Sequence, residues 1–274
     1  MLPRSGYIDR MSEPSIEEKL RALSVLVVDD HEINREFLRT GLTRIVGHLD
    51  AVDSGPAAIE CCRTRAYDVI LMDLHMPHMD GLATATRIRD LDGPASRTRM
   101  LVLTADARPE ERERLLEAGF DDYLNKPMGI AELTEALARL IAPVDSGQAP
   151  LADRRSRGAR LVDFQRACVA ANGDAATARR LSHMLGEELG SKLPVLDAWL
   201  AAGRHEQAST LLHQWAGASG FAGATRFSHA CRNLRQRLSA AHSSSPGTAY
   251  ADFLRTAHAT REALLTATPD ADLS

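Results

Sequence analysis

Short apolar runs divide the first half of the chain at regular intervals. Three of them lack the alternation of polar and apolar residues that half-exposed strands show, which is typical of strands buried on both faces of a parallel sheet. Two weaker segments complete the series. The predicted strands are 24–28, 47–52, 69–72, 100–104 and 122–125.

Apolar residues between these strands recur at helical spacing. After a lead-in with a short helix near 16–22, the helices are expected at 31–45, 54–65, 80–91, 109–118 and 129–141. Regular alternation of strands and helices predicts an α/β fold with a doubly wound, five-stranded parallel sheet. Because its crossovers are right-handed, the carboxyl ends of all strands should meet at one edge.

The pattern after residue 160 is helical throughout. Helices are expected at 161–171, 174–202, 204–220, 224–241 and 247–267, the second with a break at Gly190 or Pro194. Short connections between amphipathic helices predict an antiparallel bundle. The expected organisation is a lead-in at 1–21, an α/β domain at 22–142, a linker at 143–160, a bundle at 161–268 and a tail at 269–274.

Composition and charge limit the possible classes of protein. With 44% hydrophobic residues, 26% charged residues and no apolar run of the ~18 residues that span a bilayer, we expect a cytoplasmic protein with four reduced cysteines. Residues 1–142 carry a net charge of −7, and residues 161–274 carry +1. The acidic first half argues against nucleic-acid binding, and the asymmetry favours attraction between the two halves.

Polar residues end four of the predicted strands and should converge at one edge of the sheet. They are Asp29-Asp30, Asp73, Thr104 and Lys126. Taken singly, each has a simpler role: an aspartate as a helix cap, the threonine as a polar strand end, the lysine as a solvated side chain. Together, three carboxylates within ~4 Å repel each other by several kcal/mol at an effective dielectric near 20, so the cluster requires a cation.

Oxygen ligands of this kind suit Mg²⁺. We expect Asp30, Asp73 and the backbone carbonyl of His75 to bind it directly and Asp29 to act through water. Lys126 would meet negative charge on whatever Asp73 accepts. A carboxylate nucleophile, a divalent metal and a lysine are the parts that phosphoryl transfer to an aspartate requires.

These motifs resemble those of response-regulator receiver domains. The resemblance lies in Val27–Asp30, Leu71–Gly81, Leu103–Ala105 and Asp122–Pro127, which occur in order within residues 22–142. It implies a flavodoxin-like fold and phosphorylation of Asp73. It also implies that Tyr123 is a switch aromatic, which turns inward when Thr104 engages the phosphoryl group.

The bundle half has one unusual helix face. At helical spacing, His213 shares a face with Ala216, Gly217 and Gly220. A glycine inside a helix costs up to ~1 kcal/mol, so two beside one histidine require a reason. Clearance is one, because small neighbours let another protein bring a reactive group to the imidazole. The alternative is an ordinary histidine beside a helix-packing groove.

This segment, together with Gly223-Ala224 and residues 231–234, resembles the histidine-phosphotransfer (HPt) domain over about 161–268. The resemblance implies a four-helix bundle in which His213 carries a phosphoryl group and exchanges it with receiver aspartates. The chain departs from the family at Ala216, where a lysine is usual, and at Arg235, where a glutamate is usual. We expect Arg235 to supply the missing positive charge.

The combination predicts a phosphotransfer protein without a kinase catalytic core. Asp73 would accept a phosphoryl group from a sensor histidine kinase, and His213 would exchange it with its own receiver or with other receiver or HPt proteins. The alternative is a binding switch whose bundle docks a partner without carrying phosphate, which Ala216 favours. Neither function involves nucleic acid or membrane.

A linker of ~18 residues spans about 20–25 Å as a flexible coil, which leaves open whether the two domains meet.

Overall fold

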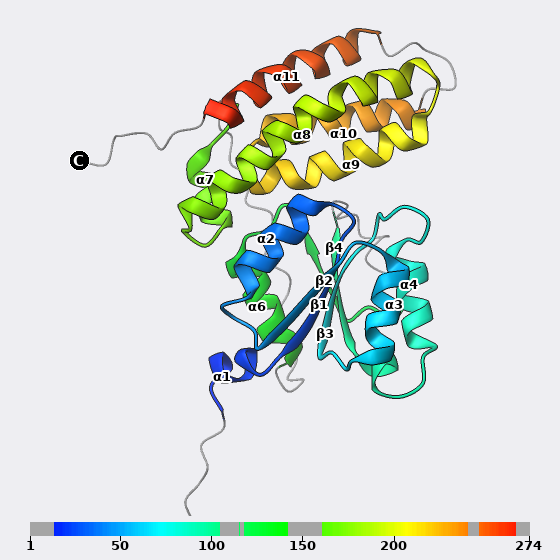
Figure 1. Cartoon of the computed structure of the whole chain (residues 1–274), viewed down its shortest axis with the longest axis vertical. Coiled ribbons are helices and arrows are strands. Elements are labelled where there is room, and N and C mark those ends of the chain that lie inside the picture. Colours follow the sequence, from blue (N-terminus) through cyan, green and yellow to red (C-terminus); the bar gives the residue numbers. More distant parts are fainter. Residues whose placement is uncertain (1–13, 105–114, 116–117, 142–160, 241–246, 267–274) are drawn as a thin grey trace, which may run out of the picture.

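The computed structural model describes residues 14–104, 115, 118–141, 161–240 and 247–266. Within this part, the chain forms an α/β unit and a helical bundle that lies against it (Figure 1). The predicted linker at 143–160, the tail at 269–274 and nearly all of the helix predicted at 109–118 lie outside the described residues.

The sheet has five parallel strands in the order β2-β1-β3-β4-β5. This is the flavodoxin-like strand order. From β1 the chain first adds β2 on one side and then crosses over to add β3 on the other side, and this change of side opens a crevice at the carboxyl ends of β1 and β3. The predicted fold of the first domain is therefore confirmed. The strands are β1 (Ser24–Val28), β2 (His48–Val52), β3 (Val69–Asp73), β4 (Arg99–Thr104) and β5 (Asp122–Asn125).

Helices cover both faces of the sheet. Figure 1 shows α2 and α6 on one face and α3 and α4 on the other. Successive strand residues point to opposite faces, so Val25 and Val27 join the core under α2 and α6, while Leu26 and Val28 join the core under α3 and α4. The helices are α1 (Ile16–Arg21), α2 (Glu32–Leu42), α3 (Gly55–Thr64), α4 (Gly81–Arg89) and α6 (Ile130–Ile141), with a short 3₁₀ turn at Pro94–Arg97.

The turn after β3 is held in a tight shape. The Asp80 side chain accepts a hydrogen bond from the Ala83 backbone N–H at 2.7 Å and so caps α4. A Cβ atom at Gly81 would lie 2.4 Å from the carbonyl oxygen of Asp73, so only glycine allows this approach. The loop that follows Asp73 is thereby fixed against the end of its own strand.

The second half forms a bundle of four long helices with a short helix beside it. Neighbouring helices pack in the order α8, α9, α10, α11, and α11 packs back against α8. Trp215, Phe227 and Phe253 fill the centre and contact one another. The helices are α7 (Phe164–Ala170), α8 (Ala175–Ala201), α9 (His205–Phe221), α10 (Thr225–Ala240) and α11 (Gly247–Thr266).

The predicted break in the second helix of this half is wrong. Helix α8 runs unbroken from Ala175 to Ala201 and contains Pro194. An internal proline removes a backbone hydrogen bond and typically costs about 3 kcal/mol. Here α8 packs against both α9 and α11 and buries Leu189, Leu193 and Leu196 around the proline. Burial of about 1.5–3 kcal/mol for each leucine offsets that cost.

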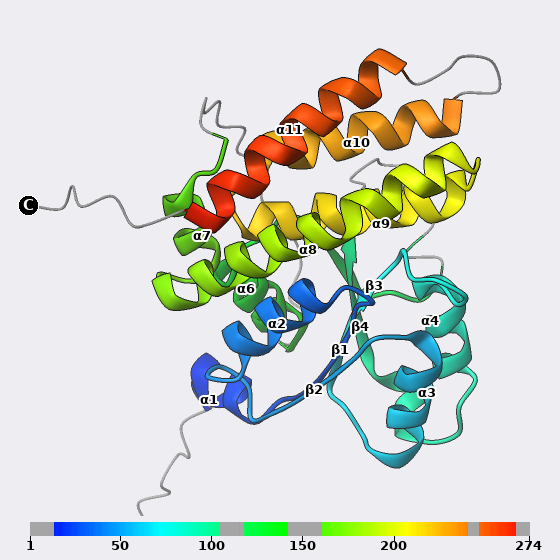
Figure 2. The ribbon, with the colours of Figure 1, turned by 45° about the horizontal axis from the view of Figure 1, so that its top comes forward.

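The two units are in direct contact, which the sequence had left open. In both views α8 and α9 lie beside α2 and over the carboxyl edge of the sheet (Figures 1 and 2). Phe37 of α2 stacks on Phe221 of α9 with ring centroids 3.9 Å apart, and both rings are 1% exposed. An ion pair from Arg180 to Glu36 at 3.0 Å lies at the same interface. The apolar core is therefore continuous between the two units.

The two glycines on the His213 face provide a test of this contact. A Cβ atom at Gly220 would lie 2.0 Å from Cβ of Pro127, whereas one at Gly217 would have its nearest neighbours at 3.7 Å, an ordinary contact. We predict that Gly220→Ala separates the units and that Gly217→Ala does not. Small-angle X-ray scattering should show a larger radius of gyration for Gly220→Ala alone.

Both substitutions favour the helix by up to about 1 kcal/mol, so far-ultraviolet circular dichroism should show intact helices in each variant. An unchanged radius of gyration in Gly220→Ala would contradict the docked arrangement.

Candidate functional site

Three carboxylates converge at the carboxyl edge of the sheet. Asp29 and Asp30 follow β1, and Asp73 is the last residue of β3, the neighbouring strand. One oxygen from each lies within 4.8 Å of the others. Asp29 and Asp73 are buried, and Asp30 is half-buried. The strand order brings the three carboxylates together, because β1 and β3 are parallel neighbours whose carboxyl ends meet at the same edge of the sheet.

Lys126 lies in the middle of this acidic cluster. Its Nζ is 2.7 Å from an oxygen of Asp29 and 3.2 Å from Oδ2 of Asp73. Burial by itself lowers the pKa of the lysine, but the attraction of Asp29 and Asp73 outweighs it, so the pKa lies above its ordinary value. The Lys126 side chain is therefore a fixed positive charge between two carboxylates.

The oxygens of the three carboxylates are not equally occupied. Asp29 accepts hydrogen bonds from the His31 backbone N–H, the Asn34 amide and Lys126. In contrast, Oδ1 of Asp30 and Oδ1 of Asp73 are buried without a hydrogen-bond partner. Burial, and then the charges of Asp29 and Asp73, raise the pKa of Asp30 to about 6. Two buried, unpaired carboxylate oxygens beside a third carboxylate fit a hard divalent cation such as Mg²⁺.

The remaining residues predicted for this site lie on β4 and β5. Thr104 is fully buried at the end of β4, opposite Asn125 in the register, and its carbonyl accepts the Lys126 backbone N–H at 2.6 Å. Tyr123 is half-buried on β5 and packs against the apolar core under α3 and α4. Ala105, which belongs to the threonine motif, lies outside the described residues.

His213 of α9 faces the acidic cluster from the bundle. One of its ring nitrogens lies within 4.8 Å of a carboxylate oxygen of Asp73, and its ring centroid is 4.3 Å from that of His75. The side chain is only 5% exposed. Burial, followed by the neighbouring His75, Arg235 and Lys126, holds the pKa of His213 well below its ordinary value. The imidazole is therefore neutral at pH 7.

Arg235 of α10 contacts the same imidazole. Its guanidinium NH1 lies 2.7 Å from Nδ1 of His213, which assigns Nδ1 as the acceptor in the neutral ring. A cavity of about 480 Å³ opens between the two units at this point and is lined by His75, His213, Arg235 and neighbouring residues. The arrangement leaves room beside the imidazole and a positive charge at its edge.

Asp73, His75 and His213 also lie close enough together to resemble a metal-binding triad. Two cations border this group: Lys126 at Asp73 and Arg235 at His213. Their charges oppose a second divalent ion there.

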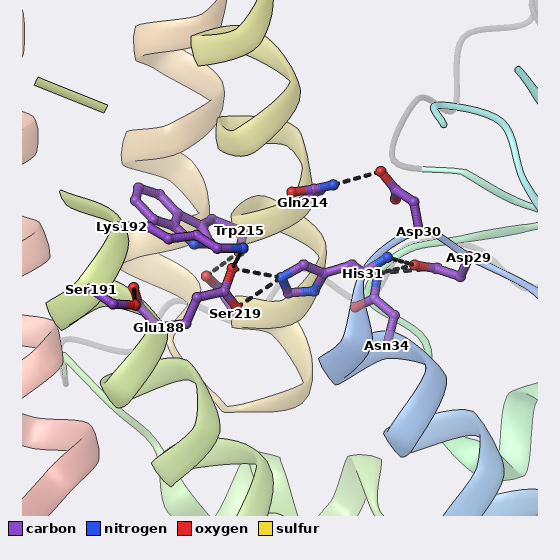
Figure 3. A network of polar contacts seen from close by, with 10 residues as sticks. All are labelled: Asp29, Asp30, His31, Asn34, Glu188, Ser191, Lys192, Gln214, Trp215 and Ser219. Carbon is purple, nitrogen blue, oxygen red and sulfur yellow. Dashed lines mark hydrogen bonds and ion pairs between the residues drawn. The ribbon is translucent and has the colours of Figure 1, made fainter. Parts of the chain in front are cut away.

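Several polar contacts at the interface were not identified from the sequence. The Gln214 amide donates a hydrogen bond to Oδ2 of Asp30 at 2.5 Å, and Nε2 of His31 lies 2.9 Å from a Glu188 oxygen (Figure 3). Burial raises the pKa of Glu188, but His31 and Lys192 outweigh it and lower that pKa to about 2. Gln214 adjoins the histidine motif, which was a usable signal. The sequence gives no comparable signal for Glu188.

The fold and this acidic edge define the class of the first unit. Residues 25–138 match the family model of the response regulator receiver domain, so this part of the chain is a receiver domain.

Similarity to characterised proteins extends beyond the receiver. The chain is 30% identical over 241 residues to the signal transduction histidine-protein kinase BarA of Shigella flexneri, and 30% identical over 233 residues to the sensor histidine kinase GacS of Pseudomonas protegens. These alignments cover 82% and 83% of this chain but 25% of each relative. The chain thus spans about a quarter of the length of these relatives.

Among solved structures, the receiver domain of the sensor histidine kinase PA1611 from Pseudomonas aeruginosa has a magnesium ion coordinated in its active-site cleft. It is 33% identical to this chain, with a TM-score of 0.41, and the match covers 44% of this chain and 98% of that domain.

Of the helices in the described part of the chain, none combines the length and the apolar character needed to cross a membrane.

The raised pKa of Asp30 leads to a prediction about how the stability of the protein depends on this carboxylate and on metal. Because the folded protein holds the pKa of Asp30 near 6, above its ordinary value, the stability that Asp30 contributes is present below about pH 4 and is lost as the pH rises through 6. In EDTA at pH 7.5, Asp30→Asn should raise the free energy of unfolding by about 1–3 kcal/mol, allowing for partial solvent screening.

Mg²⁺ should stabilise the wild type against urea and stabilise Asp30→Asn less, because a ligand is lost. The exposed Asp92→Asn is the matched control and should follow the wild type in both buffers. A wild-type response to Mg²⁺ in Asp30→Asn would exclude this carboxylate as a ligand.

Proposed function

We propose that this chain is a phosphorelay protein in which Asp73 and His213 exchange a phosphoryl group. One observation carries the proposal: a nitrogen of a neutral histidine and an oxygen of a strand-end carboxylate face each other within 4.8 Å across two units. Similarity to two histidine kinases over more residues than the receiver domain contains supports the assignment. In this proposal, residues 22–142 act as the receiver and residues 161–268 as an HPt domain.

The transfer would run in either direction through the same contact. From phosphohistidine, an oxygen of Asp73 attacks phosphorus, the phosphorus–nitrogen bond breaks, and its electron pair stays on the imidazole, which takes up one proton. An aspartyl phosphate results. Arg235, at Nδ1 of His213, stabilises the negative charge that develops on the departing ring. In the reverse direction a nitrogen of the neutral imidazole attacks phosphorus, the phosphorus–oxygen bond to Asp73 breaks with its electron pair on the carboxylate, and the ring releases one proton.

The charges around Asp73 match this chemistry. Lys126 neutralises negative charge at the acceptor, and Thr104 ends the adjacent strand, where its hydroxyl would bind a phosphoryl oxygen. Asp30, Asp73 and the carbonyl of His75 would hold Mg²⁺, with Asp29 acting through water. When bound, the metal would stabilise the charge on the oxygens of the group in transit. Tyr123 would report the phosphorylated state by moving inward from its half-buried position.

A sensor histidine kinase would supply the phosphoryl group to Asp73. In the docked arrangement α8 and α9 of the bundle lie over the edge of the sheet that such a donor must reach (Figure 2). Donation therefore requires the bundle to move away, and exchange with His213 requires it to return. Other receivers would take the phosphoryl group from His213 in the open arrangement.

Radiolabelled transfer from a cognate kinase tests this function. Label should reach both residues in the wild type, be absent in Asp73→Ala, and be confined to Asp73 in His213→Ala. Acid and alkali stability of the label separates aspartyl phosphate from phosphohistidine.

The competing function is a binding switch, in which the bundle docks a partner without carrying phosphate. Label on Asp73 but never on His213 in the wild type would favour that switch and exclude the relay.

Arg235 provides a second test. We predict that Arg235→Glu slows exchange between Asp73 and His213 by about ten- to hundredfold, because it replaces the donor at Nδ1 by a negative charge. Arg237→Glu, an exposed position on the same helix, is the control for a change of net charge. Phosphorylation of Asp73 by the kinase should be unchanged in both variants. Equal exchange rates in the two variants would exclude a role for Arg235.

A further inference from the structure

Gln214 of the bundle donates a hydrogen bond to a carboxylate of the acidic cluster. It follows His213 on α9, is half-buried, and donates its amide N–H to Oδ2 of Asp30 at 2.5 Å (Figure 3). Phosphoryl exchange between His213 and Asp73 does not require this contact. Its position on Asp30 rather than on Asp73 needs a separate explanation.

The contact makes the two carboxylate oxygens of Asp30 different from each other. Oδ2 accepts the Gln214 amide, whereas Oδ1 is buried without a hydrogen-bond partner. The unpaired Oδ1 of Asp73 belongs to the same cluster. A hydrogen bond to one oxygen of a carboxylate fixes the orientation of the other, which is how an outer partner orients a metal ligand. Gln214 thus occupies the oxygen that the metal does not need.

Docking and metal binding consequently favour each other. When the bundle closes, it buries Asp30 beside two other carboxylates, and this repulsion opposes closure. A divalent cation on the two Oδ1 atoms removes the repulsion, and the Gln214 amide holds Asp30 in the geometry that binds the cation. Such coupling is reciprocal. The free energy by which the bound cation favours docking equals the free energy by which docking favours binding of the cation.

We propose that Gln214 couples docking of the bundle to Mg²⁺ binding in the receiver, by orienting Asp30 from the opposite domain. The bundle then completes the metal site of the receiver as well as presenting a histidine to it. This inference rests on the proposed assignment of Asp30 and Asp73 as metal ligands. Gln214 is a positioning residue and does not touch the transferred group.

Titration of Mg²⁺ into the unphosphorylated 274-residue chain by calorimetry tests the proposal. Gln214→Leu keeps the size of the side chain but removes the donor, and it should weaken Mg²⁺ binding by about tenfold. Gln207→Leu, the same change at an exposed position of α9, should bind as the wild type does. Gly220→Ala, which is predicted above to separate the units and leaves Gln214 unchanged, should weaken binding to a similar degree.

Two outcomes would overturn the coupling. Unchanged Mg²⁺ affinity in Gln214→Leu means that the amide does not orient the ligand, and tighter binding means that it competes with the metal. Neither result bears on phosphoryl exchange, because no phosphodonor is present in the titration. Conversely, failure of His213 to accept label would leave the Mg²⁺ titration and its interpretation intact.

Discussion

Like charges held together at one edge of the sheet are the constraint on which the rest of the structure depends. Parallel strands with β1 beside β3 bring Asp29, Asp30 and Asp73 within 4.8 Å, where burial prevents water from screening their repulsion. Lys126 compensates part of this charge from the loop after β5. Oδ1 of Asp30 and Oδ1 of Asp73 stay unpaired, so the folded receiver keeps oxygens positioned for a divalent cation.

The bundle is shaped to fit over this edge. Glycines at 217 and 220 cost α9 intrinsic helix stability. At Gly220 the missing side chain allows a closer approach, because a Cβ atom there would lie 2.0 Å from Cβ of Pro127. The same approach buries His213, which keeps the imidazole neutral. Close approach of α9 to the receiver and the neutral form of the histidine thus have one cause. Stacking of Phe37 on Phe221 places this contact within a continuous apolar core.

Arg235 changes how charge is supplied at this histidine. A lysine at position 216, about one turn along α9, would have to fit where Ala216 is 3% exposed and its carbonyl accepts a hydrogen bond from Ser228 of α10. Arginine on α10 instead reaches Nδ1 from the side of the interface cavity. The positive charge therefore reaches the ring without a long side chain at the buried position 216.

The sequence by itself determined the five-stranded parallel sheet, the resemblance to receiver domains and the acidic cluster at one edge. Apolar runs, strand-end carboxylates and turn residues are local signals that can be read along the chain. It also located His213 and its small neighbours. It failed where packing between distant segments decides: α8 continues through Pro194 because α9 and α11 support it. Only the tertiary structure brought His213 to Asp73, Gln214 to Asp30 and Glu188 to His31, because contacts between residues more than 100 positions apart leave no periodicity in the chain.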